Sequence, residues 1–275
     1  MKSLKLVVKK YLPKPLLNKL SGMMSLTAVP KDPDAVISDL FPYRIEQGWN
    51  TYFELLHVPA LLDPNNCKEN NSANFVFFDV QGKKIFEFDI DTKGIVRNTI
   101  SIKEVLNKAG IVANGTFACF HTGSPQWVKG NSGFLAERGY TGYQNKTMSL
   151  TRGYAHGNLD AIAKSEDGNL SMLGTTHWKK RKYCLQYELS GTAVYELFFV
   201  NTSKSTRKLL IDVISVKTGQ IIENEIINIP SKGVGCLERK VEMNDSIKIV
   251  INSHLNLARP VVFRSNENSF DVFHG

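Results

Sequence analysis

The sequence is poor in cysteine, and its four cysteines follow no metal-binding or redox pattern. Cys67, Cys119, Cys184 and Cys236 lie far apart, with neither a CxxC pair nor a Cys/His ligand spacing among them. Structural zinc sites and thioredoxin-like redox sites need ligands at short, fixed spacings. We therefore expect reduced and mostly buried thiols, as in a protein of the cytoplasm.

Long apolar runs and the familiar catalytic motifs are also missing. No stretch approaches the roughly 18 apolar residues that a membrane-spanning helix requires. The run Gly130–Gly133 is not a GxSxG nucleophile motif, because position 134 is Phe. A phosphate-binding P-loop and an HExxH zinc motif do not occur in the sequence. These absences favour a non-catalytic role without a cofactor, although they leave open whether the protein is an enzyme.

Acidic residues are lacking at the start of the chain, which accounts for most of the net charge. Asp32 is the first acid, and the six lysines in the first twenty residues contribute most of the formal net charge of +8. A nucleic-acid-binding domain is basic on a folded face rather than in a tail, so we expect no nucleic-acid partner. The basic run Trp178–Lys182 is better explained as an edge strand whose lysines prevent pairing with other chains.

Residues 1–24 have a basic amphipathic pattern. Leu4 and Val8 can share one helical face with lysines opposite, and Pro13 ends that helix. Lysines interrupt every apolar stretch that could serve as a signal peptide. Such a segment can lie on an anionic bilayer, where each Lys contributes about 1 kcal/mol; the alternative is a solvated terminus. We expect residues 1–29 to be a basic N-terminal segment of a cytoplasmic protein held peripherally at the inner face of a membrane.

The second half of the chain repeats landmarks of the first half. The paired landmarks are Phe77 with Phe198, Arg138 with Arg259, and His156-Gly157 with His274-Gly275. Their offsets are 121, 121 and 118 residues. Landmarks that recur in the same order at a nearly constant offset predict two copies of one unit.

Short apolar or alternating stretches separated by turn residues fill both halves, a pattern typical of β-sandwiches and barrels. We predict an all-β fold of two tandem, internally duplicated, jelly-roll-like β-sandwich domains. They would occupy residues 30–163 and 170–275, with a linker at residues 164–169. A capping box formed by Ser101 and Glu104 predicts one short helix.

Aromatic and basic residues gather in the first copy and suggest a ligand site. The candidate ligand-binding residues are Trp127, Arg138, Tyr140, Arg152, Tyr154 and His156. Trp127 lies in a glycine-rich loop that is longer than its counterpart in the second copy, and long loops on rigid sheets often carry function. If the strands around Tyr140 and Tyr154 pair, tyrosine rings could stack on a sugar while arginines bind its acidic groups.

A metal site is the alternative interpretation of part of this set. Its candidate ligands are His121, His156, Asp160 and His177, although their spacing matches no known ligand pattern. Because a His-Gly pair recurs as His274-Gly275, the favoured explanation of His156 is that it ends a strand.

Two classes of function therefore stay open. The first is a non-catalytic binding or assembly protein that recognises carbohydrate or anionic glycan in bacterial cell-surface polysaccharide or envelope processes. The second is a hydrolase or transferase, metal-dependent or not, that uses the His/Arg/Asp cluster of the first copy. The mutual distances of the four candidate metal ligands would distinguish the two.

Overall fold

The protein has an all-β fold with one short helix, which confirms the predicted class. The computed structural model describes residues 28, 30–32, 34–56, 72–92, 97–121, 139–148 and 152–275, without the side chains of residues 156, 158 and 159. The predicted amphipathic segment of residues 1–24 lies outside the described residues.

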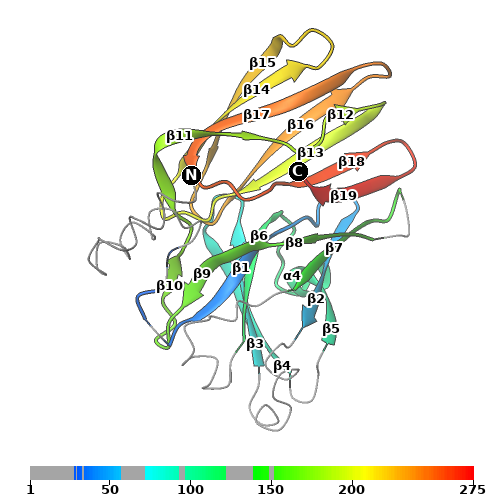
Figure 1. The fold of residues 1–275 in the computed structure, drawn as a ribbon. Coiled ribbons are helices and arrows are strands. Elements are labelled where there is room, and N and C mark those ends of the chain that lie inside the picture. The colour runs from blue at the N-terminus through cyan, green and yellow to red at the C-terminus, as the bar shows by residue number, and fades with distance from the viewer. Residues whose placement is uncertain are drawn as a thin grey trace, which may run out of the picture.

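The N-terminal half forms two antiparallel sheets, called sheet A and sheet B (Figure 1). Sheet A has the order β10 (Leu170–Met172), β9 (Asn158–Lys164), β1 (Val36–Tyr43), β6 (Gly115–His121), β3 (Ser72–Asp79) and β4 (Lys84–Asp91). Sheet B has the order β5 (Arg97–Ser101), β2 (Trp49–Leu56), β7 (Tyr140–Asn145) and β8 (Gly153–His156).

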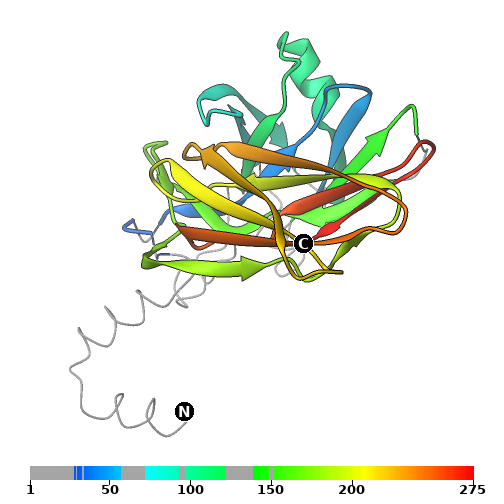
Figure 2. The same cartoon turned by 90° about the horizontal axis from the view of Figure 1, so that it is seen from above.

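The C-terminal half forms two further antiparallel sheets, called sheet C and sheet D. Sheet C has the order β11 (Thr176–Cys184), β17 (Ser246–Leu255), β14 (Arg207–Ser215) and β15 (Ile221–Ile229), and the short β12 (Leu189–Ser190) also pairs with β17. Sheet D has the order β16 (Val234–Val241), β13 (Ala193–Val200), β18 (Val261–Ser265) and β19 (Phe270–His274). The four sheets are arranged like the blades of a four-bladed β-propeller, with one sheet curved as a half-barrel (Figures 1 and 2).

The strand order of the two halves is the same. The order β1-β6-β3-β4 in sheet A matches β11-β17-β14-β15 in sheet C, and β5-β2-β7-β8 in sheet B matches β16-β13-β18-β19 in sheet D. Strand β3 therefore corresponds to β14, and β13 corresponds to β2. The expected superposition of Phe77 on Phe198 is wrong, because similar apolar runs reflect similar burial rather than the same place in a sheet.

The later landmarks do occupy matching positions. Tyr140 is paired with His156 across β7 and β8, and Val261 is paired with His274 across β18 and β19. Arg138 itself lies outside the described residues.

Residues 164–169, predicted as a linker, instead belong to a hairpin. Lys164 ends β9 and Leu170 begins β10, and the two strands pair directly. The backbone N–H of Ser165 donates to the carbonyl of Asn169 at 3.0 Å, and Gly168 has a φ of 84°, which a glycine adopts readily. Both strands belong to sheet A, so the chain passes to the second half only after Met172.

The short helix α4 (Ile102–Lys108) forms where the capping box predicted it. The Ser101 hydroxyl accepts a hydrogen bond from the backbone N–H of Glu104 at 3.4 Å. The helix ends before Gly110, whose φ is 73°. Its buried residues, Ile102 and Leu106, pack into the core of the first half.

Each half has its own apolar core between its two sheets. In the first half, side chains from β1, β3 and β6 of sheet A meet side chains from β2 and β5 of sheet B, with Phe53 and Phe117 at 5.2 Å between ring centroids. In the second half, β14, β15 and β17 of sheet C pack against β13, β16 and β18 of sheet D. Alternate side chains of each strand point toward its core. The opposite faces of β1, β3 and β6 in sheet A are buried as well.

A third cluster joins the halves. Trp49 and Tyr143 of sheet B pack against Phe263 of sheet D, with ring centroids 5.2 and 4.8 Å from it. Arg44, which follows β1, lies 4.3 Å above the Trp49 ring and forms a bidentate ion pair with Glu196 at 2.6 and 2.7 Å. Both partners of this pair are largely buried, so its breakage should be costly.

Candidate functional site

The outward face of sheet B brings polar and aromatic side chains together. Phe53 and Leu55 of β2 point into the core, so Tyr52 and Glu54 between them point outward. Two rows cross the face: Thr99, Glu54 and Tyr140 in one, with the backbone of His156 paired at its end, and Ser101, Tyr52, Gly142 and Tyr154 in the other. We call this surface the open face of sheet B.

A carboxylate organises the charged part of the open face. Glu54 is only 7% exposed, and its Oε2 accepts a hydrogen bond from the Thr99 hydroxyl at 2.8 Å. The guanidinium of Arg97 lies 3.3 Å from the same carboxylate, and that of Arg152 lies 3.6 Å away. One carboxylate thus holds two arginines on opposite edges of the sheet, one on β5 and one beside β8.

The aromatic rings of the open face have defined places. The Arg152 guanidinium lies over the Tyr52 ring, 3.7 Å from its centroid. A Cβ added at Gly142 would lie 2.9 Å from the Tyr154 ring, so this glycine leaves the space that the ring occupies. Tyr140 and Tyr154 are 44% and 47% exposed. Exposed tyrosine rings combine an apolar surface with a polar hydroxyl, which suits contact with sugars and other amphipathic ligands.

The structure assembles half of the predicted ligand set. Tyr140, Arg152 and Tyr154 lie on the open face of sheet B, and the backbone of His156 pairs with Tyr140 at its edge. Trp127 and Arg138 lie outside the described residues.

Sequence reasoning missed three members of the site: Tyr52, Glu54 and Arg97. The alternation in Trp49–Leu56 could have indicated that Tyr52 and Glu54 share an outward face. The contacts of Glu54 with Arg97 and Arg152 had no local signal, since these residues are 43 and 98 positions away in the chain.

The four residues proposed as metal ligands lie on four strands, with His156 at the end of β8 of sheet B. His121 ends β6 of sheet A, Asp160 is in β9 of sheet A, and His177 is in β11 of sheet C. Within the described residues, no group of three or more His, Cys, Asp or Glu is placed to hold a metal ion. The side chain of His156 is not among those described.

The basic run is part of an edge strand, as the sequence predicted. Strand β11 is the outermost strand of sheet C, and Trp178 on it is 79% exposed. In the part of the chain that the structure describes, no helix is long and apolar enough to cross a membrane.

Comparisons with known proteins give no family for this chain. No protein family and no curated protein matches the sequence. A solved structure of the infectious bursal disease virus Gx strain has 11% identity and a TM-score of 0.18, over 88% of this chain and 56% of that one. A β-glucuronidase from glycoside hydrolase family 2 has 9% identity and a TM-score of 0.15, over 92% of this chain and 26% of that one. At these values neither likeness carries an argument about structure or function.

Proposed function

We propose that the protein is a non-catalytic binding or assembly protein that recognises carbohydrate or anionic glycan through the open face of sheet B. The observation that carries the proposal is the joint placement of exposed Tyr140 and Tyr154 with Arg152, which Glu54 and Tyr52 hold in position. Sugar rings stack on tyrosine, and guanidinium groups bind carboxylate or sulfate in a bidentate manner. Work on bacterial cell-surface polysaccharide or the envelope is the setting that we propose for this binding.

Titration of Tyr154→Ala with uronate-containing and neutral oligosaccharides tests the proposal. Loss of a stacking aromatic should weaken binding at least about tenfold, given the contribution of buried aromatic contacts. Tyr187→Ala is the matched control, because it removes an exposed tyrosine of the second half that lies outside the open face of sheet B. Equal affinity of both variants and the unmodified protein, or no oligosaccharide binding at all, would rule the open face out as a glycan site.

We also propose that residues 1–24 bring this cytoplasmic protein to an anionic membrane surface. The support is the sequence pattern of lysines opposite apolar residues. Sedimentation with anionic liposomes should be released by salt, because exposed charges are screened over about 8–10 Å at physiological ionic strength. Lys9→Glu with Lys10→Glu should weaken binding by a few kcal/mol, at about 1 kcal/mol per basic residue plus new repulsion. Binding that ignores both salt and these substitutions would contradict an electrostatic attachment.

For the architecture, we propose two tandem copies of one jelly-roll-like sandwich unit. The supporting observations are the matching strand orders of the two halves and the separate core within each half. If the halves are copies, a superposition that aligns β2 with β13 and β3 with β14 should also align the remaining six pairs of strands.

A hydrolase or transferase is the second candidate, and one observation favours it. Asp160 has a φ of 49°, which is uncommon outside glycine, and its Oδ1 is buried without a hydrogen-bond partner among the described residues. Strained backbone often occurs at functional sites. Metal analysis of purified protein, with Asp160→Asn as the comparison, tests this candidate. Bound metal in the unmodified protein alone would support the enzyme, and equal metal content in both would count against Asp160 as a ligand.

A further inference from the structure

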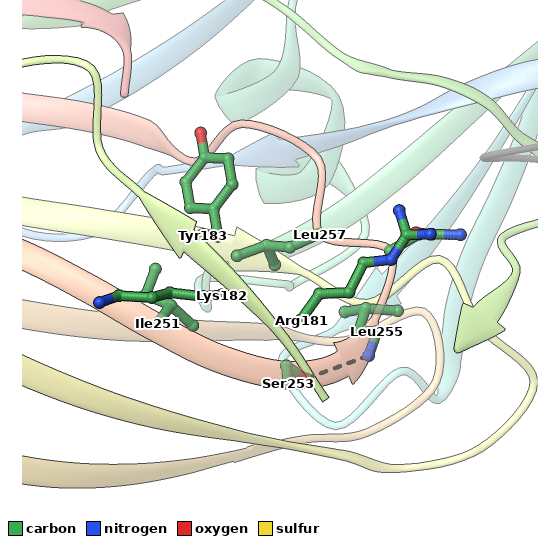
Figure 3. Close-up of a pocket in the computed structure, with 8 residues that line it drawn as sticks. Arg181, Lys182, Tyr183, Ile251, Ser253, Leu255 and Leu257 are labelled. Carbon is green, nitrogen blue, oxygen red and sulfur yellow. Dashed lines mark hydrogen bonds between the residues drawn. The ribbon is translucent and has the colours of Figure 1, made fainter. Parts of the chain in front are cut away.

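The second half of the protein has a pocket, and its residues are distant in the sequence from those of the open face of sheet B. It has a volume of about 210 Å³ between β11 and the end of β17. Arg181, Lys182 and Tyr183 line it from β11, and Leu255 and Leu257 are among the residues that face them (Figure 3). The pocket therefore combines cationic side chains with an apolar wall.

An irregularity of β11 forms this pocket. Thr176 pairs with Leu255 and Arg181 pairs with Ser253, so five steps along β11 correspond to two along β17. The surplus residues bulge out of the ladder, and a bulge bends the strand and redirects its side chains. The bulge therefore widens the edge of sheet C next to Arg181, where the pocket lies.

Apart from the two cations, the polar side chains of the pocket form hydrogen bonds with other parts of the protein. The Asn256 amide contacts the side chains of His177 and Thr175, and the Ser253 hydroxyl donates to the Lys208 carbonyl at 2.9 Å. Arg181 and Lys182 are exposed, and neither forms an ion pair with another described residue. Charged donors are the strongest binding groups available in the pocket.

The two cations lie at different ends of the pocket. In Figure 3 the Arg181 side chain extends toward Leu255, whereas that of Lys182 extends past Ile251 in the opposite direction. One ligand group would therefore meet Arg181 with the leucines beside it. A guanidinium has the planar fork that fits a carboxylate, and the apolar wall suits the carbon body of the same molecule.

We propose that this pocket is a second ligand site, which binds the carboxylate of a small organic acid through Arg181 and packs its carbon body against Leu257. The proposal does not depend on glycan binding by sheet B, since the two sites share no residue.

Nuclear magnetic resonance titration at constant ionic strength tests the proposal. Sodium glucuronate is the probe, glucose is the neutral ring of similar size, and inorganic phosphate is the anion without a carbon body. Glucuronate should shift the backbone amide signals of residues 181–183 and 251–257 in a saturable manner, whereas glucose should not. Arg181→Met should raise the dissociation constant at least about tenfold, because a charge-assisted bidentate contact is lost.

Lys248→Met is the matched control, because Lys248 is an exposed lysine on β17 that does not line the pocket. Unchanged binding by this variant with loss in Arg181→Met supports the proposal. Equal shifts with glucose, or equal loss in both variants, would overturn it. Binding of phosphate without binding of glucuronate would overturn the carboxylate assignment. Tyr154→Ala should leave this titration unchanged, so failure of either site can be recognised separately.

Discussion

Sheets B and D occupy equivalent positions in the two halves, yet their outward faces differ in chemistry. Across sheet B the first row contains Thr99, Glu54, Tyr140 and His156, and across sheet D the equivalent row contains Cys236, Phe198, Val261 and His274. In the second row, Tyr52, Gly142 and Tyr154 of sheet B correspond to Glu196, Phe263 and Val272 of sheet D.

The difference in side chains accompanies a difference in burial. Phe198, Val261 and Phe263 are buried against Trp49 and other residues of the first half. Tyr140 and Tyr154 keep nearly half of their surface. The same backbone arrangement therefore holds the halves together in one place and presents a polar, aromatic surface in the other. An apolar face gains stability by burial, and a polar face avoids the cost of desolvation by staying open.

Breaking the ion pair at the junction should have the largest effect on stability. Arg44→Met leaves Glu196 without its partner in a largely buried position, and it also removes the cation from the Trp49 ring. We expect the free energy of unfolding to fall by about 3–5 kcal/mol, measured by urea denaturation. The double variant Arg44→Met with Glu196→Met should recover much of this loss, because neither charge is then stranded. Additive losses would show that the pair acts through packing alone.

A cavity on the face of sheet D should cost somewhat less. Phe263→Ala removes a fully buried ring at the junction, and we expect a loss of about 3 kcal/mol. The matched substitution on sheet B is Tyr154→Ala, which should change the free energy of unfolding by less than about 1 kcal/mol because the ring is exposed. Thermal and urea denaturation of both variants would check this. Similar losses would mean that the two faces are not distinguished by burial.

Neutralising the carboxylate of sheet B should have a smaller effect. Glu54→Gln can keep the hydrogen bond from Thr99, but it weakens the contacts with Arg97 and Arg152. We expect a loss of about 1–2 kcal/mol, since hydrogen bonds to charged groups exceed neutral ones by roughly that amount. Glycan titration of the same variant should show weaker binding as Arg152 loses its fixed position. Unchanged binding would show that the contacts of Arg97 and Arg152 with Glu54 do not contribute to ligand binding.

The smallest expected effect is on the free energy of unfolding at acid pH, through Glu87 of sheet A. Burial alone would raise the pKa of Glu87, but hydrogen bonds from Lys164, Lys84 and Asn74 outweigh it and lower the pKa to about 2. This carboxyl therefore stabilises the fold above its unfolded pKa near 4.5, and the contribution is lost as the pH falls toward 2. Because Glu87 is partly exposed, we expect only about 1 kcal/mol.

Urea denaturation of Glu87→Gln between pH 6 and pH 2 would measure this contribution. The variant should be less stable than the unmodified protein at pH 6, and the difference should vanish near pH 2. A difference that persists at pH 2 would indicate a packing effect rather than a titration.

Local sequence signals predicted individual elements well. The alternating stretches of the second half became β13 to β19, and the capping box became helix α4. Tyr140 and Tyr154 were expected on neighbouring strands, which they are. These features depend on periodicity, turn residues and caps, all of which act within a few residues of the chain.

The pairing and equivalence of strands far apart in the chain could not be predicted from the sequence alone. The similarity of Phe75–Phe78 to Glu196–Phe199 suggested equivalent strands, whereas β13 takes the place of β2. The predicted linker became a hairpin because β10 finds its partner in β9.

The sequence by itself determined an all-β chain with recurring landmarks and a Tyr/Arg-rich region in its first half. The tertiary structure alone decided that Glu54 holds Arg97 and Arg152, that sheet D is covered while sheet B stays open, and that β11 bulges to form a pocket. The physical reason is the range of the interactions. Strand and turn preferences are set by neighbouring residues, whereas sheet pairing, burial and ion pairs depend on contacts between residues far apart in the chain.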